Sequence, residues 1–255
     1  MTEQAMTDTI LTERRDRVLI ITMNRPEAKN AINGDLATGL WAAIEELNTD
    51  PSLTAGVLTG AGGAFCSGMD LKAFAKGEDI GPITEFFQAG AEKPLIAAIE
   101  GFALAGGLEI ALSCDLLVAA KGARLGIPEV KVGLFAAGAG LMRLPSRVGY
   151  GKAMEMAVTG DPISAEDGHA YGLISRLADP GTAVDVAIEL AERIAKNAPL
   201  GVAASKQIIR ATQGATEEEL FAFQSSMYGK VFGSNDAKEG PAAFAQKRDP
   251  EWTGT

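Results

Sequence analysis

The stretch GFALAGGLEIALSCDLLVAA, Gly101–Ala120, places two adjacent glycines and one glutamate inside an almost continuous apolar run. Because the run is apolar on nearly every side, it predicts a buried helix that continues into a strand. A carboxylate inside such a helix is costly unless it has hydrogen-bond partners or a chemical task. Glu109 is therefore the first candidate functional residue.

Strand-like and helix-like segments alternate on both sides of this stretch. Residues 18–24, 53–60 and 94–101 are short apolar runs that predict strands, and residues 33–50 carry apolar side chains at helical spacing. This alternation predicts an α/β architecture.

The carboxyl-terminal part of the chain has a different character. Residues 183–199 and 217–233 both predict amphipathic helices, and no strand is predicted between them. We expect a core domain over residues 1–198 and a helical section over residues 199–255. The chain contains no low-complexity linker, which favours a second part packed closely on the first.

Composition excludes several classes of protein. The 255 residues carry a net charge of -10, from 23 Lys+Arg against 33 Asp+Glu, which argues against a general nucleic-acid-binding protein. The amino terminus lacks the apolar segment of a secretory signal, and no apolar run is long enough to span a bilayer. We expect a cytoplasmic protein that works without nucleic acid or membrane.

Cysteine and histidine are too scarce for several kinds of site. Cys66 and Cys114 are too few for a disulfide framework or a cysteine-based zinc site. His169 is the only histidine, so a histidine-rich metal site is excluded and a Ser-His-Asp triad would have to use it. It follows Ser164 at the start of a predicted helix, where a surface role is the simpler interpretation. We expect no metal.

The densest glycine cluster lies in TGAGGAFCSGMDLKAF, Thr59–Phe74. A nicotinamide or flavin site is disfavoured because Phe65 occupies the third glycine position of the dinucleotide-binding pattern, as Arg143 does in the segment GAGLMR that starts at Gly138. The glycines fit either tight turns or backbone N–H groups that face a developing negative charge.

Several ordered motifs resemble the crotonase (enoyl-CoA hydratase/isomerase) superfamily. They are NRPEAKNAIN, GAFCSGMDLK, GFALAGGLEIALSCD, GIPEVKVGL and SNDAKEGPAAFAQKRDP, and together they span nearly the whole chain. The resemblance implies an α/β spiral of ββα units with a helical carboxyl-terminal oligomerisation section, in a homotrimer or homohexamer. It also implies an acyl-CoA thioester substrate and no further cofactor, since CoA is part of the substrate.

The same resemblance assigns catalytic roles. It places an oxyanion hole at the backbone N–H groups of Met69 and Gly106, the latter at the amino terminus of the buried helix, where an anion is favoured. It places the two catalytic glutamates of the family's hydratases at Glu109, which would activate water, and Glu129, which would supply a proton.

Substrate-binding positions follow from the resemblance too, although several have an equally good structural explanation. Asp70 is explained equally well as a helix cap, and Lys72 as a surface charge. Lys29 and Lys247 are explained equally well as residues on a solvent-exposed face. The resemblance suggests contacts to CoA or substrate at Ala28, Lys29, Ala64, Asp70, Leu71, Ala137 and Lys247, the last from a neighbouring subunit.

One segment departs from the family pattern. Many hydratases have P-G-x-G-G after the second glutamate, whereas this chain has FAAGAG, with Ala136 and Ala137 in place of the proline and the first glycine. We expect an enoyl-CoA hydratase-like enzyme. The alternatives are a 3-enoyl to 2-enoyl-CoA isomerase, a carnitinyl-CoA dehydratase-like enzyme and a non-catalytic acyl-CoA-binding module.

Overall fold

A computed structural model describes residues 8–255 of the chain. The chain divides into two compact units, one ending at Ala191 and one comprising Glu192–Thr255. The division lies near the 198/199 boundary expected from the sequence. No helix among the described residues is long and apolar enough to cross a membrane.

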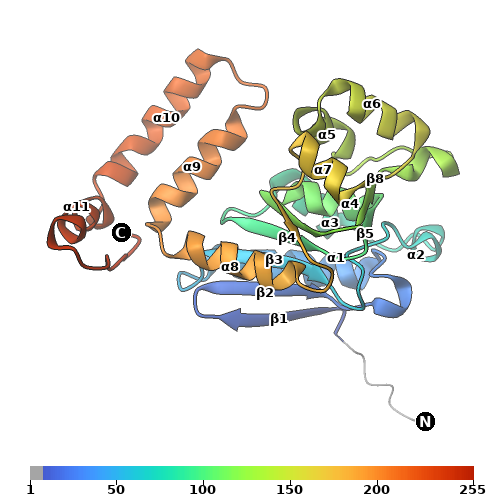
Figure 1. Ribbon diagram of the computed structural model, residues 1–255, viewed down its shortest axis with the longest axis horizontal. Coiled ribbons are helices and arrows are strands. Elements are labelled where there is room, and N and C mark those ends of the chain that lie inside the picture. The colour runs from blue at the N-terminus through green and yellow to red at the C-terminus, as the bar shows by residue number, and fades with distance from the viewer. Residues whose placement is uncertain (1–7) are drawn as a thin grey trace, which may run out of the picture. The chain divides into compact units, whose positions relative to one another are not determined.

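The first unit is built on a six-stranded sheet in the order β1-β2-β3-β4-β6-β9. Strands β1 to β4 of this sheet are labelled in Figure 1. Only the β1–β2 pair is antiparallel, and the other neighbours are parallel. The strands are β1 Ile10–Arg15, β2 Val18–Met23, β3 Ala55–Gly60, β4 Leu95–Ile99, β6 Leu116–Ala120 and β9 Arg176–Ala178. Strands β2, β3 and β4 are buried along nearly their whole length, as parallel strands covered on both faces are.

A three-stranded sheet, β5-β7-β8, lies beside this framework. It consists of β5 Phe102–Leu104, β7 Arg124–Gly126 and β8 Ile163–Ser164. Helix α4, Gly106–Ser113, starts directly after β5 and leads to β6, so the predicted helix followed by a strand is confirmed. All of its residues except Gly106 are buried.

The remaining helices of the first unit connect and follow the strands. Asn33 caps α1, Gly34–Thr49, by accepting a hydrogen bond from the Leu36 amide, and this helix buries the apolar face predicted for residues 33–50. The others are η1 Pro26–Ala28, α2 Leu71–Ala75, α3 Gly81–Ala89, η2 Pro128–Val132, α5 Gly140–Val148, α6 Tyr150–Thr159 and α7 Ala165–Tyr171.

The second unit is helical, as expected. Helix α8, Ala183–Ala195, runs across the division, and α9 Pro199–Ala211, α10 Glu217–Phe232 and α11 Asn235–Gln246 follow it. Thr216 and Glu219 form a reciprocal capping box at the start of α10. The Trp252 indole donates to the Lys196 carbonyl and ties the end of the chain to the start of this unit.

Candidate active site

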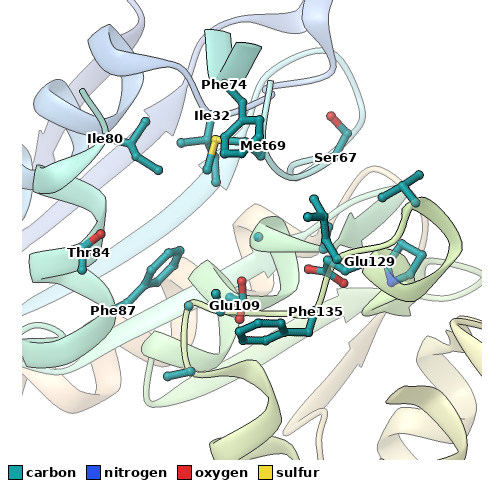
Figure 2. A pocket seen from close by; sticks show the side chains of 18 of the residues that line it. Ile32, Ser67, Met69, Phe74, Ile80, Thr84, Phe87, Glu109, Glu129 and Phe135 are labelled. Carbon is teal, nitrogen blue, oxygen red and sulfur yellow. The ribbon is translucent and has the colours of Figure 1, made fainter. Parts of the chain in front are cut away.

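A cavity of about 910 Å³ opens in the first unit beside the amino terminus of α4. Its walls come from the loop before α2, from α3, α4 and η2, and from the 134–139 loop. Figure 2 shows the Glu109 and Glu129 carboxylates directed into the cavity, with Phe135 beside Glu109 and Met69 across from both glutamates. Two glutamates separated by 19 intervening residues thus face the same space.

The amides of Met69 and Gly106 lie close together at one end of this cavity. A methyl group placed on Gly106 would lie 3.8 Å from the Met69 nitrogen, and one placed on Gly68 would lie 3.2 Å from the Gly106 nitrogen. Within residues 8–255 neither N–H group donates a hydrogen bond, although the neighbouring Ile32, Asp70 and Ala105 amides all do. Two unpaired amides that line a cavity can hold an oxyanion.

Ala105 precedes this amide pair in a conformation that an alanine seldom adopts. Its φ is 51° and its ψ is -131°, in a region that glycine tolerates and that costs a residue with a Cβ atom about 1–3 kcal/mol. Ala105 also lines the cavity. This backbone geometry turns the chain from β5 into α4 so that the Gly106 N–H is left free.

Glu109 sits in the first turn of α4 and is only 4% exposed. Its Oε1 accepts a hydrogen bond of 2.9 Å from the Gly140 amide. The pKa of Glu109 is raised above its usual value, because burial outweighs the amides of Gly140 and Gly138 and the charge of Arg143, which lower it. A buried carboxylate that accepts amide hydrogen bonds on one side and faces a cavity on the other can act as a general base.

Glu129 enters the cavity from η2, immediately after Pro128. Its Oε2 is buried and has no hydrogen-bond partner among the described residues. The pKa of Glu129 is raised to about 7, mainly by burial and also by the charge of Glu109, against the effect of its own backbone amide. A carboxyl group with this pKa is substantially protonated at neutral pH and can donate a proton.

The rest of the cavity is mainly apolar. Phe87 from α3 and Phe135 from the loop after η2 flank Glu109, and Ile80 and Phe74 lie farther along the wall (Figure 2). Phe135 is 67% exposed, so part of this wall faces solvent. Such a surface suits an uncharged acyl chain.

The other residues proposed for substrate contact divide into two groups. Leu71 and Ala137 line the cavity. Asp70 caps α2 through the amides of Lys72 and Ala73 and pairs with Arg25 at 3.1 Å, so the cap suggested by the sequence is present. The positions outside the cavity lining are Ala28, Lys29, Ala64, Asp70 and Lys247, and their contact with CoA stays a prediction.

Cysteine and histidine take structural positions. Cys66 and Cys114 are buried free thiols, and burial raises the pKa of Cys66 to about 12, which makes it a poor nucleophile. His169 lies in α7, which Ser164 caps as expected, and its Nδ1 is 2.8 Å from the Ile174 carbonyl oxygen. Residues 8–255 contain no group of three His, Cys, Asp or Glu side chains arranged to bind a metal ion.

Sequence reasoning missed the groups that surround Glu109. Phe87 and Phe135 are ordinary apolar residues in the sequence, and nothing in their local pattern marks them as cavity residues. Arg143 was named only in a failed dinucleotide-binding pattern, and Gly138 and Gly140 only in that pattern and in the FAAGAG segment. The departure from the family pattern at Ala136 and Ala137 was the one sequence signal that pointed to these surroundings, because it lies in the loop that holds Glu109.

Comparisons with known proteins agree with this geometry. The enoyl-CoA hydratase/isomerase family model matches residues 13–255. An enoyl-CoA hydratase of Mycobacterium tuberculosis is 40% identical over 95% of both chains. A carnitinyl-CoA dehydratase of Salmonella arizonae is 39% identical over 98% of this chain and 100% of its own. The crystal structure of an enoyl-CoA hydratase from Mycobacterium marinum superposes with a TM-score of 0.94 at 53% identity, covering 98% of this chain and 100% of its own.

Proposed function

The chain belongs to the enoyl-CoA hydratase/isomerase family, and from this premise we propose that it adds water reversibly to the 2,3 double bond of an enoyl-CoA thioester. The observation that carries the proposal is the joint exposure of Glu109 and Glu129 to one cavity beside two unpaired backbone amides. Hydration needs a base, an acid and a site for the enolate oxygen, and these groups supply all three.

In the proposed reaction, the thioester carbonyl oxygen accepts hydrogen bonds from the Met69 and Gly106 amides. Glu109 takes a proton from water as the water oxygen bonds to C3, and the electron pair of the double bond moves to the carbonyl oxygen. Glu129 then delivers its proton to C2 as the enolate collapses. Each amide of such a hole contributes about 3 kcal/mol to transition-state stabilisation.

The different environments of the two glutamates support this division of roles. Glu129 has a pKa of about 7 and an oxygen without a partner, which suits an acid. Glu109 accepts the Gly140 amide hydrogen bond, which favours the ionised form that a base requires. At the end of one hydration Glu109 is protonated and Glu129 is ionised, so proton exchange with solvent restores the starting state.

The cavity lining favours an uncharged acyl group over a carnitinyl group. Among the described residues that line it, the only carboxylates are Glu109 and Glu129, and Lys131 and Arg143 add positive charge. A trimethylammonium group would find no further carboxylate there, whereas an apolar chain would contact Phe87 and Phe135. The carnitinyl-CoA dehydratase-like alternative is therefore the weaker one.

An isomerase and a non-catalytic binding module are the remaining alternatives. An isomerase shuttles one proton between C2 and C4 and requires only one carboxylate, so the second glutamate in the cavity favours the hydratase. A binding module would gain nothing from the costly burial of Glu109.

Assembly and the nucleotide end of the ligand are part of the same proposal. We infer a homotrimer or homohexamer in which Lys247 of one subunit and Lys29 of another approach the phosphates of CoA. Lysine side chains suit phosphate recognition as point charges. The two buried free thiols support a cytoplasmic enzyme.

A turnover screen tests the hydratase assignment. Purified protein is mixed with 2-enoyl-CoA thioesters of different chain lengths and with a carnitine-derived enoyl-CoA, and the absorbance of the conjugated thioester is followed. We expect absorbance loss with apolar substrates, and calorimetry should show acyl-CoA binding and no NAD binding. Acyl-CoA binding without any turnover would replace the hydratase by the binding module.

A further inference from the structure

Arg143 connects three elements that surround Glu109. It lies on α5, the helix whose first residue, Gly140, donates to the Glu109 carboxylate. Its Nη2 donates to the Phe87 carbonyl near the end of α3, and its Nη1 donates to the Ser113 hydroxyl at the end of α4 over 2.7 Å. One guanidinium therefore joins α3, α4 and α5.

These contacts continue to Glu109 itself. The Ser113 hydroxyl donates a hydrogen bond of 2.9 Å to the backbone carbonyl of Glu109, so Arg143 reaches the main chain of this residue through a single side chain. The ring of Phe87 packs beside the Gly138 backbone, where a methyl group would lie 2.5 Å from the ring and 2.8 Å from Glu109 Oε2. A shift of either element would move the carboxylate.

Arg143 also places a positive charge near Glu109. Among the described cavity-lining residues, η2 contributes Glu129 and Lys131, α5 contributes Arg143, and α3 contributes no charged group. Lys131 pairs with Asp161 at 2.6 Å, and the charge of Arg143 lowers the pKa of Glu109 against the effect of burial.

We propose that Arg143 is a positioning residue for the hydration reaction, which clamps α3, α4 and α5 around Glu109 and supplies the positive charge that favours its ionised carboxylate. This inference rests on the proposed function, because it assigns Glu109 the role of base. A guanidinium suits the task because its planar fork donates to two acceptors at once, whereas an ammonium offers only a point charge.

Three variants separate the clamping role of Arg143 from the effect of its charge on Glu109. Arg143→Gln removes the charge, Arg143→Lys keeps the charge and loses the fork, and Arg147→Gln is the matched control. Arg147 lies one turn along the same helix, donates to the Asp115 carbonyl at 3.5 Å and is not among the described residues that line the cavity.

The measurements are the pH profile of kcat/KM and the infrared titration of Glu109, whose carboxyl band is assigned by its loss in Glu109→Gln. For Arg143→Gln we expect kcat to fall about tenfold or more. We also expect the acidic limb and the Glu109 titration to move up by on the order of one pH unit. Arg143→Lys should have a lower kcat, but the acidic limb of its pH profile should stay at the wild-type pH. Arg147→Gln should match the wild type in both.

The outcomes are distinct. A folded Arg143→Gln variant with wild-type rate and titration overturns the inference, as does an Arg147→Gln variant with the same losses. If Arg143→Gln does not fold, Arg143→Lys decides, because unchanged kcat there contradicts the clamp. If the wild type hydrates no enoyl-CoA, the proposed function fails, while the infrared titration still tests the effect of Arg143 on Glu109.

Discussion

The Gly140 amide donates a 2.9 Å hydrogen bond to Oε1 of Glu109, joining the first residue of α5 to the first turn of α4. The loop that departs from the family pattern at Ala136 and Ala137 is therefore the loop that holds the proposed base. Ala136 is buried and Ala137 lines the cavity, so the departure changes the wall and keeps the amide contact.

Gly138→Ala should impair catalysis by displacing Glu109. A methyl group at this position would lie 2.8 Å from Glu109 Oε2 and 2.5 Å from the Phe87 ring, distances that cannot be accommodated without movement. We expect a loss on the order of 100-fold in kcat, because misplacement by about 1 Å costs this much. Gly151→Ala is the control, since a methyl group there has no atom within 4 Å. Equal activity of the two variants would show that Glu109 is not held by this loop.

Ala105→Gly should stabilise the fold. Ala105 has a φ of 51°, and glycine relieves the strain of this conformation, for an expected net gain of about 1 kcal/mol or about 2–4 °C in Tm. Ala89→Gly, at the exposed end of α3, should instead lower Tm slightly, because glycine there adds only unfolded-state entropy. Calorimetric melting of both variants provides the measurement. A lower Tm for Ala105→Gly would mean that the Ala105 methyl packs favourably enough to outweigh the strain.

Much of this architecture could be predicted from the sequence because its signals are local. The strands β2, β3 and β4 and the helix α1 follow from apolar runs and spacing, and α4 follows from its apolar composition. Strand β1 was not predicted, because its exposed side chains other than Leu11 are polar and only its pairing with β2 defines it.

The active site could be predicted from the sequence less completely than the fold. Glu109 stands out as a glutamate in an apolar run, but Glu129 looks like an ordinary turn residue, and only the family resemblance paired the two. The contacts of Phe87, Gly138 and Arg143 with the surroundings of Glu109 depend on how α3, α4 and α5 pack. No local pattern encodes such long-range contacts.

Glu129→Gln should stabilise the protein at alkaline pH. The folded-state pKa of Glu129 is about 7, above that of an unfolded glutamate, because burial disfavours its charged form. A raised pKa gives wild-type stability that is complete below about pH 4.5 and is lost as the pH rises through about 7. Glutamine does not titrate, so the variant does not lose stability in this way as the pH rises. The difference in Tm between variant and wild type should therefore grow from pH 5 to pH 8, and a difference independent of pH would contradict the raised pKa.

Removal of α10 and α11 should abolish assembly. Tyr228 and Phe232 on α10 stack at a centroid separation of 4.0 Å and are 61% and 63% exposed, so this apolar surface lacks a partner within the described chain. A chain ending before Thr216 should sediment as a monomer, and the combined change Tyr228→Ser and Phe232→Ser should weaken assembly in the full chain. Circular dichroism melting verifies that each variant is folded. Sedimentation of the intact wild type as a monomer would contradict the proposed trimer or hexamer.

The two glutamates provide the decisive test of the reaction. Glu109→Gln and Glu129→Gln preserve size and hydrogen-bonding capacity but remove proton transfer, so each should lower the hydration rate on the order of 100-fold or more. Acyl-CoA affinity, measured by calorimetry, should change little, since neither carboxylate needs to be charged for the apolar wall to bind the chain.

The double variant separates joint action from independent action. Groups that act as a unit give strongly non-additive losses, so the Glu109→Gln, Glu129→Gln double variant should be little slower than the slower single one. An isomerase would depend mainly on Glu129 and tolerate Glu109→Gln. If neither substitution changes the turnover of any enoyl-CoA, the glutamates are not the acid and base. In that case the cost of burying Glu109 at 4% exposure would need another explanation.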